Sequence, residues 1–336
     1  MRLDDFNYRL PDSLIAQHPL HHRDKARLMV IDRARQSIVH DVFSNIGLYL
    51  PKKSCLILND SKVVPARLLG KREQSGGKVE VFLLKKLSDG YCYETLMRPL
   101  RRLKVGEKII FNNGSLMAKI EDRENRIVRF NTRNISAYLS QSGHMPLPPY
   151  IKRPDDLADR EYYQTVYARR EGSVASPTAG LHFTQRLLNR IKNAGHQIEK
   201  VTLHINYATF KPVEVTDITT HPMHYEDYTV TEKTLVAIKR AKKNGRKIVA
   251  IGTTSCRVLE TVAQSGQRKG STNLFIYPGY QFTMTDALIT NFHLPHSTLL
   301  MLVYAFGSKS LMTQAYRQAV REKYRFYSYG DAMLII

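Results

Sequence analysis

The sequence has few cysteines and no tryptophan. Cys55, Cys92 and Cys256 are scattered, with no pair at metal-ligand spacing, which excludes a disulfide scaffold and a cysteine-based zinc site. No apolar run approaches the length of a membrane span. Residues 1–6 lack the charged and apolar regions of a signal peptide. We therefore expect a cytoplasmic protein that does not contact membranes.

The chain is also short of acidic residues. Lys and Arg number 51 against 30 Asp and Glu, a formal net charge of +21. The basic residues are spread over 98–104, 186–192, 239–247 and 317–325, none of which is a low-complexity tail, so the charge belongs to folded surfaces. Solvated helix faces explain some of these residues but not the shortage of acids. A positive field attracts polyanions, so we predict a nucleic-acid partner.

The 336 residues, 43% of them hydrophobic, suit a globular protein of one large or two ordinary domains. Turn signals such as Ser75-Gly76-Gly77 separate short apolar stretches from residue 62 to 130, and no helical pattern lies between them. This texture predicts a small antiparallel barrel or sandwich. The predicted strands are 63–70, 78–87, 91–98, 107–111, 116–121 and 126–130.

From about residue 135 helices and strands alternate, which predicts a largely parallel α/β arrangement. Thr184 and Thr231 are predicted helix caps. Further helices are predicted at 135–140, 255–263, 297–305 and 311–323, and strands at 54–59, 198–205, 247–252, 274–277 and 332–336. The predicted fold is a larger, mixed α/β, barrel-like domain built from both chain ends, residues 1–60 and 149–336. A small antiparallel β-barrel domain is inserted at 61–148.

The segment 286–299 mixes polar and apolar residues in an unusual way. Asp286, Thr290, Asn291, His293 and Ser297 alternate with Leu, Ile and Phe. Buried polar side chains need hydrogen-bond partners, so these residues are predicted to form the wall of a polar pocket. Turn and capping residues are the alternative interpretation, since Asn, Asp and Ser often bond to nearby backbone.

The stretch 248–257 runs from a strand through Gly252 into a helix. Free N–H groups and the helix dipole make such a junction an anion site. An ordinary helix cap is the alternative. Nothing near Cys256 lowers its pKa in an obvious way, so we do not expect a nucleophilic thiol. The candidate ligands of an anion here are Thr253, Thr254, Ser255 and Arg257.

His182 and His204 both occur where strands and helices meet, the usual place of α/β active sites. The alternative is a hydrogen-bonded core histidine, which is the more common case for a histidine taken singly. The pairs His221/His224 and His293/His296 each span a proline, and no cysteine or carboxylate cluster completes them, so we predict no metal.

Two basic segments lie at the edges of the predicted insertion. Asn59, Lys62 and Arg67 belong to the first, which either grips phosphate or only starts the inserted domain. The second, 143–153, is rich in proline with aromatic and basic ends, which suits RNA stacking as well as a return linker.

Taken together, these segments resemble the S-adenosylmethionine:tRNA ribosyltransferase-isomerase family of queuosine biosynthesis. The likeness runs nearly from end to end. It is carried by the blocks at 59–68, 143–153, 163–168, 177–183, 201–204, 252–260, 275–279, 286–299 and 324–333.

The resemblance implies that S-adenosylmethionine, a co-substrate and not a true cofactor, donates its ribosyl group to 7-aminomethyl-7-deazaguanine at the wobble position of a tRNA. Epoxyqueuosine-tRNA forms, and adenine and methionine are released. On this hypothesis Asp286 or His293 is base or acid, with His182 and His204 as alternates. Thr253, Thr254, Ser255, Arg257, Asn291, Asn59 and Arg67 bind substrate. We expect tRNA and S-adenosylmethionine as partners, and a monomer.

Some positions depart from the family pattern. Asn206 and Ala208 stand where the family has glycines that allow positive φ, and Cys256 replaces a usual Val. Smaller changes are Asp60, Ser61, Lys62 and Ser176. The alternative function is a catalytically inactive tRNA-binding relative, which would not need the polar set of Asp286, Asn291 and His293. An RNA methyltransferase is a further alternative, but no glycine-rich loop follows an early strand.

Overall fold

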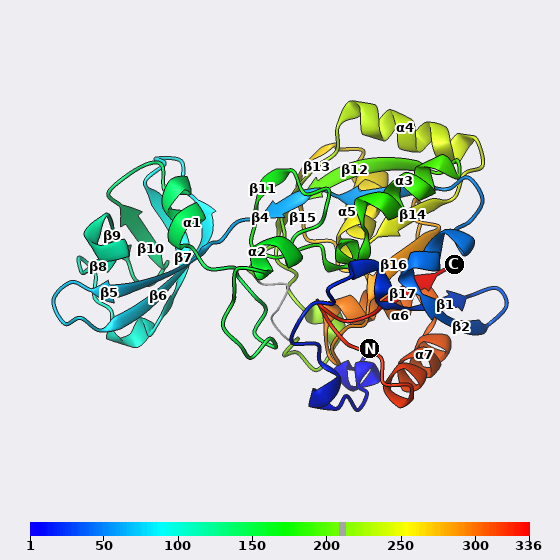
Figure 1. The fold of residues 1–336 in the computed structure, drawn as a ribbon, viewed down its shortest axis with the longest axis horizontal. Helices are drawn as coiled ribbons and strands as arrows, with labels where there is room; N and C mark the ends of the chain where they lie inside the picture. Colours follow the sequence, from blue (N-terminus) through cyan, green and yellow to red (C-terminus); the bar gives the residue numbers. More distant parts are fainter. Residues whose placement is uncertain (208–212) are drawn as a thin grey trace. The chain divides into compact units, whose positions relative to one another are not determined.

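The computed structural model describes residues 1–207 and 213–336. They form two compact units (Figure 1). The first contains Met1–Lys62, Pro148–Arg153 and Tyr162–Ile336, and the second contains Val63–Leu147 and Pro154–Glu161. Unlike the predicted insertion 61–148, the second unit takes in Pro154–Glu161, because Asp155 accepts hydrogen bonds from His144 Nδ1 and from the backbone N–H of Met145.

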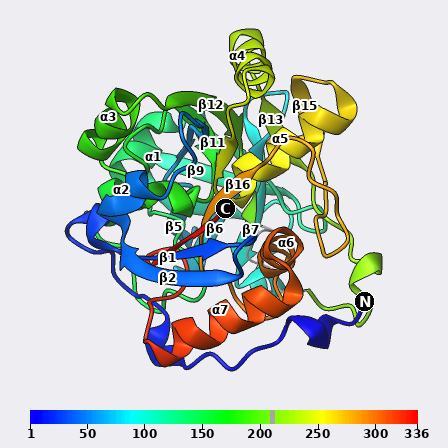
Figure 2. The same cartoon turned by 90° about the vertical axis from the view of Figure 1, so that its right-hand side faces the viewer.

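The first unit is built on a nine-stranded open sheet in the order β15-β13-β12-β3-β14-β16-β17-β1-β2. Strand β2 forms one edge and lies beside β1 (Figure 2). Strands β12, β3, β14 and β16 are mutually parallel, as are β17 and β1, whereas β16 with β17 and the outer pairs are antiparallel. The strands are β1 Arg27–Asp32, β2 Ser37–Val42, β3 Cys55–Asn59, β12 Gln197–Leu203, β13 Glu226–Thr229, β14 Ile248–Ile251, β15 Lys269–Thr272, β16 Ala287–Asn291 and β17 Ala332–Ile335.

Every residue of β3, β14, β16 and β17 is buried, because both faces of the sheet are covered. One face packs on α3 (Gln185–Asn193) and on the 3-10 helix η4 (Phe43–Leu48). The other packs on α4 (Glu232–Lys243), α5 (Thr253–Ser265), α6 (Thr298–Gly307) and α7 (Lys309–Arg321). As predicted, Thr184 caps α3 and Thr231 caps α4.

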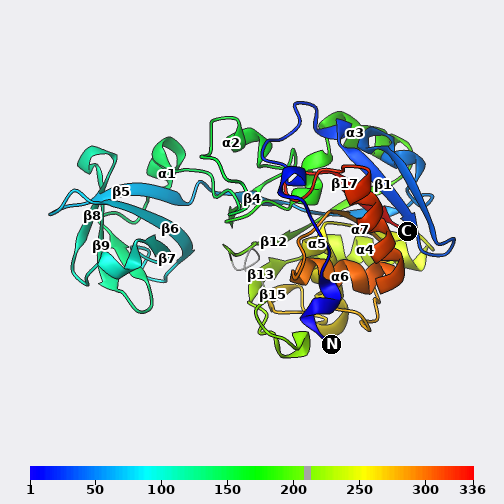
Figure 3. The same cartoon turned by 90° about the horizontal axis from the view of Figure 1, so that it is seen from below.

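The second unit is a closed antiparallel barrel in the order β10-β7-β6-β5-β8-β9 (Figure 3). Its strands are β5 Arg67–Arg72, β6 Lys78–Lys86, β7 Cys92–Arg98, β8 Lys108–Phe111, β9 Leu116–Asp122 and β10 Ile127–Phe130. Helix α1 (Ser136–Ser142) follows, and α2 (Asp159–Tyr162) begins in the later segment of this unit. The inserted barrel of the predicted fold class is therefore confirmed.

Three expectations need correction. The large sheet is open and mixed, not barrel-like or largely parallel. The predicted strand 63–70 is broken into β4 (Ser61–Val63), which pairs with β11 (Arg170–Ser173), and β5, since Pro65 has no N–H to donate. The predicted strand 274–277 does not form, because the Leu274 N–H donates to Thr272 Oγ1 and its carbonyl accepts from Arg257.

Among the residues that the structure describes, no helix combines the length and apolar character needed to cross a membrane.

Candidate active site

A cavity of about 250 Å³ lies at the carboxyl ends of β14 and β16 in the first unit. The carboxyl ends of parallel strands are where α/β proteins bind ligands. Four predicted site residues, Thr253, Thr254, Asn291 and His293, line this cavity. The other polar residues of its wall are Tyr150, Ser176, Thr178, Thr290, Ser297, Tyr327 and Ser328.

Two polar atoms of this wall have no hydrogen-bond partner among the described residues. They are Ser176 Oγ and Tyr327 Oη, both buried. A buried polar atom without a partner carries a desolvation penalty of about 1–3 kcal/mol, and native proteins rarely tolerate it. Two such atoms around one cavity are suited to hydrogen bonds with a polar ligand.

His293 is held firmly at the edge of the cavity. Its Nε2 lies 2.8 Å from Thr290 Oγ1, its N–H donates to Tyr316 Oη at 3.0 Å, and its carbonyl accepts from the Tyr8 hydroxyl. Burial lowers the pKa of His293 to about 3. The imidazole is therefore neutral at physiological pH, and one ring nitrogen keeps a lone pair.

His182 lies behind the cavity wall, not on its surface. Burial lowers its pKa to about 4, and the Asn291 side chain opposes this shift. The Asn291 side chain hydrogen-bonds His182 and so links the imidazole to the cavity wall. Asn291 Nδ2 donates to the Tyr327 carbonyl at 2.9 Å, so Asn291 connects β16 with the segment before β17.

The start of α5 forms another part of the wall. Gly252 has φ +88°, a conformation that favours glycine, and its N–H donates to the Ile289 carbonyl at 2.8 Å. Among the described residues, no side chain caps this helix. The N–H groups of this turn and the hydroxyls of Thr253 and Thr254 therefore face a site suited to a carboxylate or phosphate.

Asp286 is not brought to the cavity. It precedes β16, whereas Asn291 ends that strand, and five residues of strand span about 16 Å. The Asp286 carboxylate accepts from the Ile248 N–H at 2.8 Å and from Lys247 Nζ at 3.3 Å. These bonds link the start of β14 to the start of β16. Asp286, predicted as an acid or base, therefore has a structural position.

Three predicted ligands also lie elsewhere. Asn59 is buried, and its side chain bonds to both the N–H and the carbonyl of Leu203, each at 3.0 Å. Ser255 is buried in the first turn of α5 and does not line the cavity. Arg67 belongs to the second unit, where its guanidinium pairs with Glu80 at 2.9 Å.

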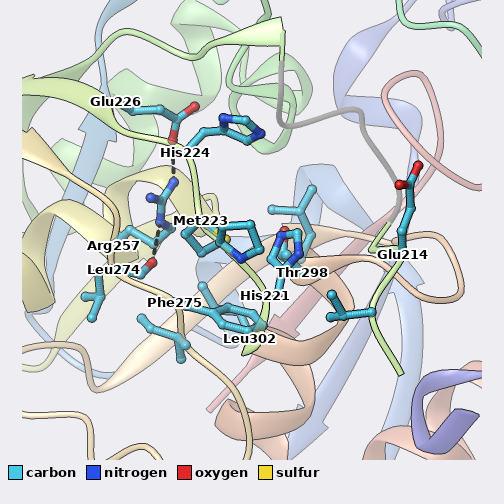
Figure 4. A pocket seen from close by; sticks show the side chains of 14 residues that line it. Glu214, His221, Met223, His224, Glu226, Arg257, Leu274, Phe275, Thr298 and Leu302 are labelled. Carbon is cyan, nitrogen blue, oxygen red and sulfur yellow. Dashed lines mark hydrogen bonds and ion pairs between the residues drawn. The ribbon is translucent and has the colours of Figure 1, made fainter. Parts of the chain in front are cut away.

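Arg257 lines a different, larger cavity of about 450 Å³ in the first unit. Figure 4 shows its guanidinium between the Glu226 carboxylate and the Leu274 carbonyl, to which Nε donates at 3.0 Å. Both side chains of the Arg257–Glu226 pair are buried, so the charge of Arg257 is neutralised within the protein. Leu299, in the first turn of α6, lines both cavities.

His204 follows β12 and lines neither cavity. Burial lowers its pKa, while Asp227 and Asp60 oppose the shift. Asn206, at the first of the two glycine positions, is not among the residues with positive φ, and its N–H donates to Glu226 Oε1 at 3.0 Å. Ala208 and Thr209 lie outside the described residues.

Sequence reasoning missed two tyrosines of the wall as site residues. The Tyr150 hydroxyl lies 2.6 Å from Ser328 Oγ, and the rings of Tyr150 and Tyr327 are 4.3 Å apart. Both lie in blocks that carry the family resemblance, 143–153 and 324–333, and membership of these blocks was the sequence signal that could have identified them. Within 1–207 and 213–336, no group of three or more His, Cys, Asp or Glu residues could hold a metal ion.

The fold is that of an α/β protein, with a partly polar cavity at the carboxyl ends of parallel strands, where proteins of this class bind small molecules. Comparison with known proteins gives the family. Residues 3–335 match the family model described as queuosine biosynthesis protein, and the chain belongs to this family. The resemblance drawn from the motifs is thereby confirmed.

This chain is similar to the following relatives over 99–100% of its length and 100% of theirs. The chain is 50% identical to the S-adenosylmethionine:tRNA ribosyltransferase-isomerase of Sulfurihydrogenibium sp. and 51% identical to that of Caldanaerobacter subterraneus subsp. tengcongensis, covering 100% of each pair. It is also similar to the crystal structure of S-adenosylmethionine tRNA ribosyltransferase from Thermotoga maritima. That comparison gives a TM-score of 0.57 and 36% identity, and covers 99% of this chain and 100% of the other.

Proposed function

We propose that the 250 Å³ cavity is where this chain performs the reaction for which its relatives are named. The chain is an S-adenosylmethionine:tRNA ribosyltransferase-isomerase of queuosine biosynthesis, with S-adenosylmethionine as co-substrate. The finer proposal is that the acceptor is 7-aminomethyl-7-deazaguanine at the wobble position, that epoxyqueuosine-tRNA forms, and that adenine and methionine leave. No finding favours the inactive alternative.

The observation that carries the assignment is the set of unpartnered polar atoms beside His293. Ribosyl transfer from a sulfonium begins with removal of a proton from the carbon next to sulfur, so the site needs a base in its unprotonated form. Because burial lowers the pKa of His293, the ring is neutral and does not repel the sulfonium cation. The same shift makes the ring a weaker base than free imidazole, so its assignment rests on its place in the cavity wall. We assign His293 as this base.

Other groups of the wall receive complementary roles. Burial raises the pKa of Tyr327, so its hydroxyl stays protonated and is a donor to the departing adenine. The start of α5, with Thr253 and Thr254, holds an anionic group such as the methionine carboxylate. His182 supports Asn291 from behind the wall. Asp286 and Arg257 are not assigned to the reaction, since protein groups already occupy their charges.

The test is the variant His293→Ala, assayed for free adenine and for modified nucleoside by mass spectrometry. Loss of a general base lowers turnover by roughly 100-fold or more, while tRNA binding, measured by fluorescence anisotropy, should persist. His196→Ala is the control, because His196 contacts Ser54 Oγ at the other end of the sheet. Turnover of His293→Ala within threefold of the unmodified protein would refute the assignment.

We also propose that residues 1–60 and 149–336 act as the catalytic domain, with 61–148 as an inserted domain, in a cytoplasmic monomer. The described wall of the cavity comes from the first unit of one chain, which supports a site complete without a second copy. Sedimentation velocity across the concentrations used for turnover tests the monomer.

A further inference from the structure

A groove of about 860 Å³ lies on the barrel of the second unit. It is lined by β5, the first half of β6, the end of β7 and the loop after β8. Its floor is formed where β5 pairs with both β6 and β8. At Gly70, in this floor, a Cβ would lie 2.6 Å from the buried Phe111 ring, so glycine lets the barrel core pack closely beneath the groove.

The charges in this groove are not balanced. Its two acids are paired, Glu80 with Arg67 at 2.9 Å and Glu73 with Lys108 at 3.8 Å. Three exposed cations of the groove take part in no ion pair of the described residues: Lys71, Lys78 and Arg98. The groove therefore presents net positive charge to solvent.

The turn after β7 extends this positive surface. Leu100–Arg102 is a 3-10 helix directly beyond Pro99, which also lines the groove. Arg101, Arg102 and Lys104 are exposed and, like the groove cations, occur in no ion pair within the described ranges. Residues 63–147 contain 16 Lys or Arg and 8 Asp or Glu, so local acids do not offset this surface.

We propose that this groove, with the turn bearing Arg101, Arg102 and Lys104, binds the sugar-phosphate backbone of the tRNA substrate. The inference rests on the proposed function for the identity of the polyanion. Exposed, unpaired cations on a hollowed surface contact phosphates without reading sequence, and small β-barrels elsewhere bind oligonucleotides on such surfaces. The reacting nucleotide is handled by the cavity of the first unit, so the groove supplies affinity and not chemistry.

The test neutralises the groove in the full chain with the triple variant Lys71→Gln, Lys78→Gln and Arg98→Gln. The control triple, Lys85→Gln, Arg123→Gln and Arg126→Gln, removes three exposed barrel cations that are also outside the described ion pairs and do not line the groove. Unmodified tRNA is titrated at several salt concentrations and followed by fluorescence anisotropy. Thermal melting verifies that both variants fold.

Each lost phosphate contact lowers the slope of log affinity against log salt by about 0.7–0.9. If the three replaced cations each contact one phosphate, the unmodified protein should lose roughly 20- to 40-fold more affinity than the groove variant between 50 and 200 mM salt. The control triple should keep the original slope. In turnover assays the groove variant should show a raised KM for tRNA and an unchanged KM for S-adenosylmethionine.

Equal slopes for the groove variant and the unmodified protein would overturn the proposal. Equal reductions in both triples would also overturn it, because they would show a diffuse field and not a site. Absence of product from the unmodified protein would contradict the proposed function instead. The binding titration still reports on the groove in that case, so the two failures are distinguishable.

Discussion

The variant Arg257→Met tests whether Arg257 stabilises the fold or binds substrate. The side chains of Arg257 and Glu226 are 8% and 4% exposed, so their ion pair is almost out of water. Removal of the guanidinium leaves the Glu226 carboxylate buried, with the Asn206 N–H at 3.0 Å as a remaining donor. Breaking a buried pair from one side costs about 3–5 kcal/mol, and we expect a loss of that size.

The double variant Arg257→Met/Glu226→Gln should recover at least half of this loss. The introduced amide would keep an acceptor for the Asn206 N–H and carries no charge, and neutral replacement of both partners is often tolerated. The assay is urea unfolding followed by circular dichroism. Lys309→Met is the matched control, because the Lys309–Asp5 pair is 2.8 Å long but 55% and 39% exposed, and should lose less than about 1 kcal/mol.

A loss below about 1 kcal/mol in Arg257→Met would refute this reasoning, as would a double variant that loses as much as the single one. If the double variant is stable but its KM for S-adenosylmethionine rises tenfold or more, the conclusion would be that Arg257 binds substrate.

Two further predictions concern stability. The pKa values of His182 and His293 are lowered to about 4 and 3, so the unfolded chain takes up protons first as pH falls below about 6.5. Stability should therefore decrease on acidification, by about 2 kcal/mol per histidine between pH 8 and pH 5. In urea titrations, His182→Gln and His293→Gln should each lose less stability on acidification than the unmodified protein, and equal losses would contradict this. Gly180→Ala places a Cβ 1.9 Å from Tyr167 Oη and should lower stability by about 1–3 kcal/mol, whereas Gly47→Ala, with nothing within 4 Å, should be nearly neutral in thermal melts.

The barrel was predictable because its strands pair with near neighbours. Turn residues such as Ser75-Gly76-Gly77 mark each reversal, and β6 and β7 follow within two residues of the expected bounds. The hairpin of β1 and β2 was missed, since β2 is largely exposed or half-buried and its apolar pattern is weak. The mixed α/β class was predicted, but the antiparallel pairs of the large sheet were not, because strand direction depends on partners distant in the sequence.

The candidate site shows the same limit. Thr253, Thr254, Asn291 and His293 follow buried strands, so their meeting at one edge was predictable from sequence. Asp286 is only five residues before Asn291, yet a strand carries the two to opposite edges of the sheet. The partner of Arg257 could not be foreseen either, because Glu226 is 31 residues away on another strand.

The strand order also governs how the chain matures on the ribosome. Strands β1 and β3 are made early, but each is flanked in the sheet by a strand that is translated after the barrel: β17 beside β1, and β12 and β14 beside β3. The barrel strands emerge consecutively and close among themselves. The apolar β3 therefore has no partner in this sheet during the synthesis of well over a hundred residues, and its unpaired edges can pair with other chains in that interval.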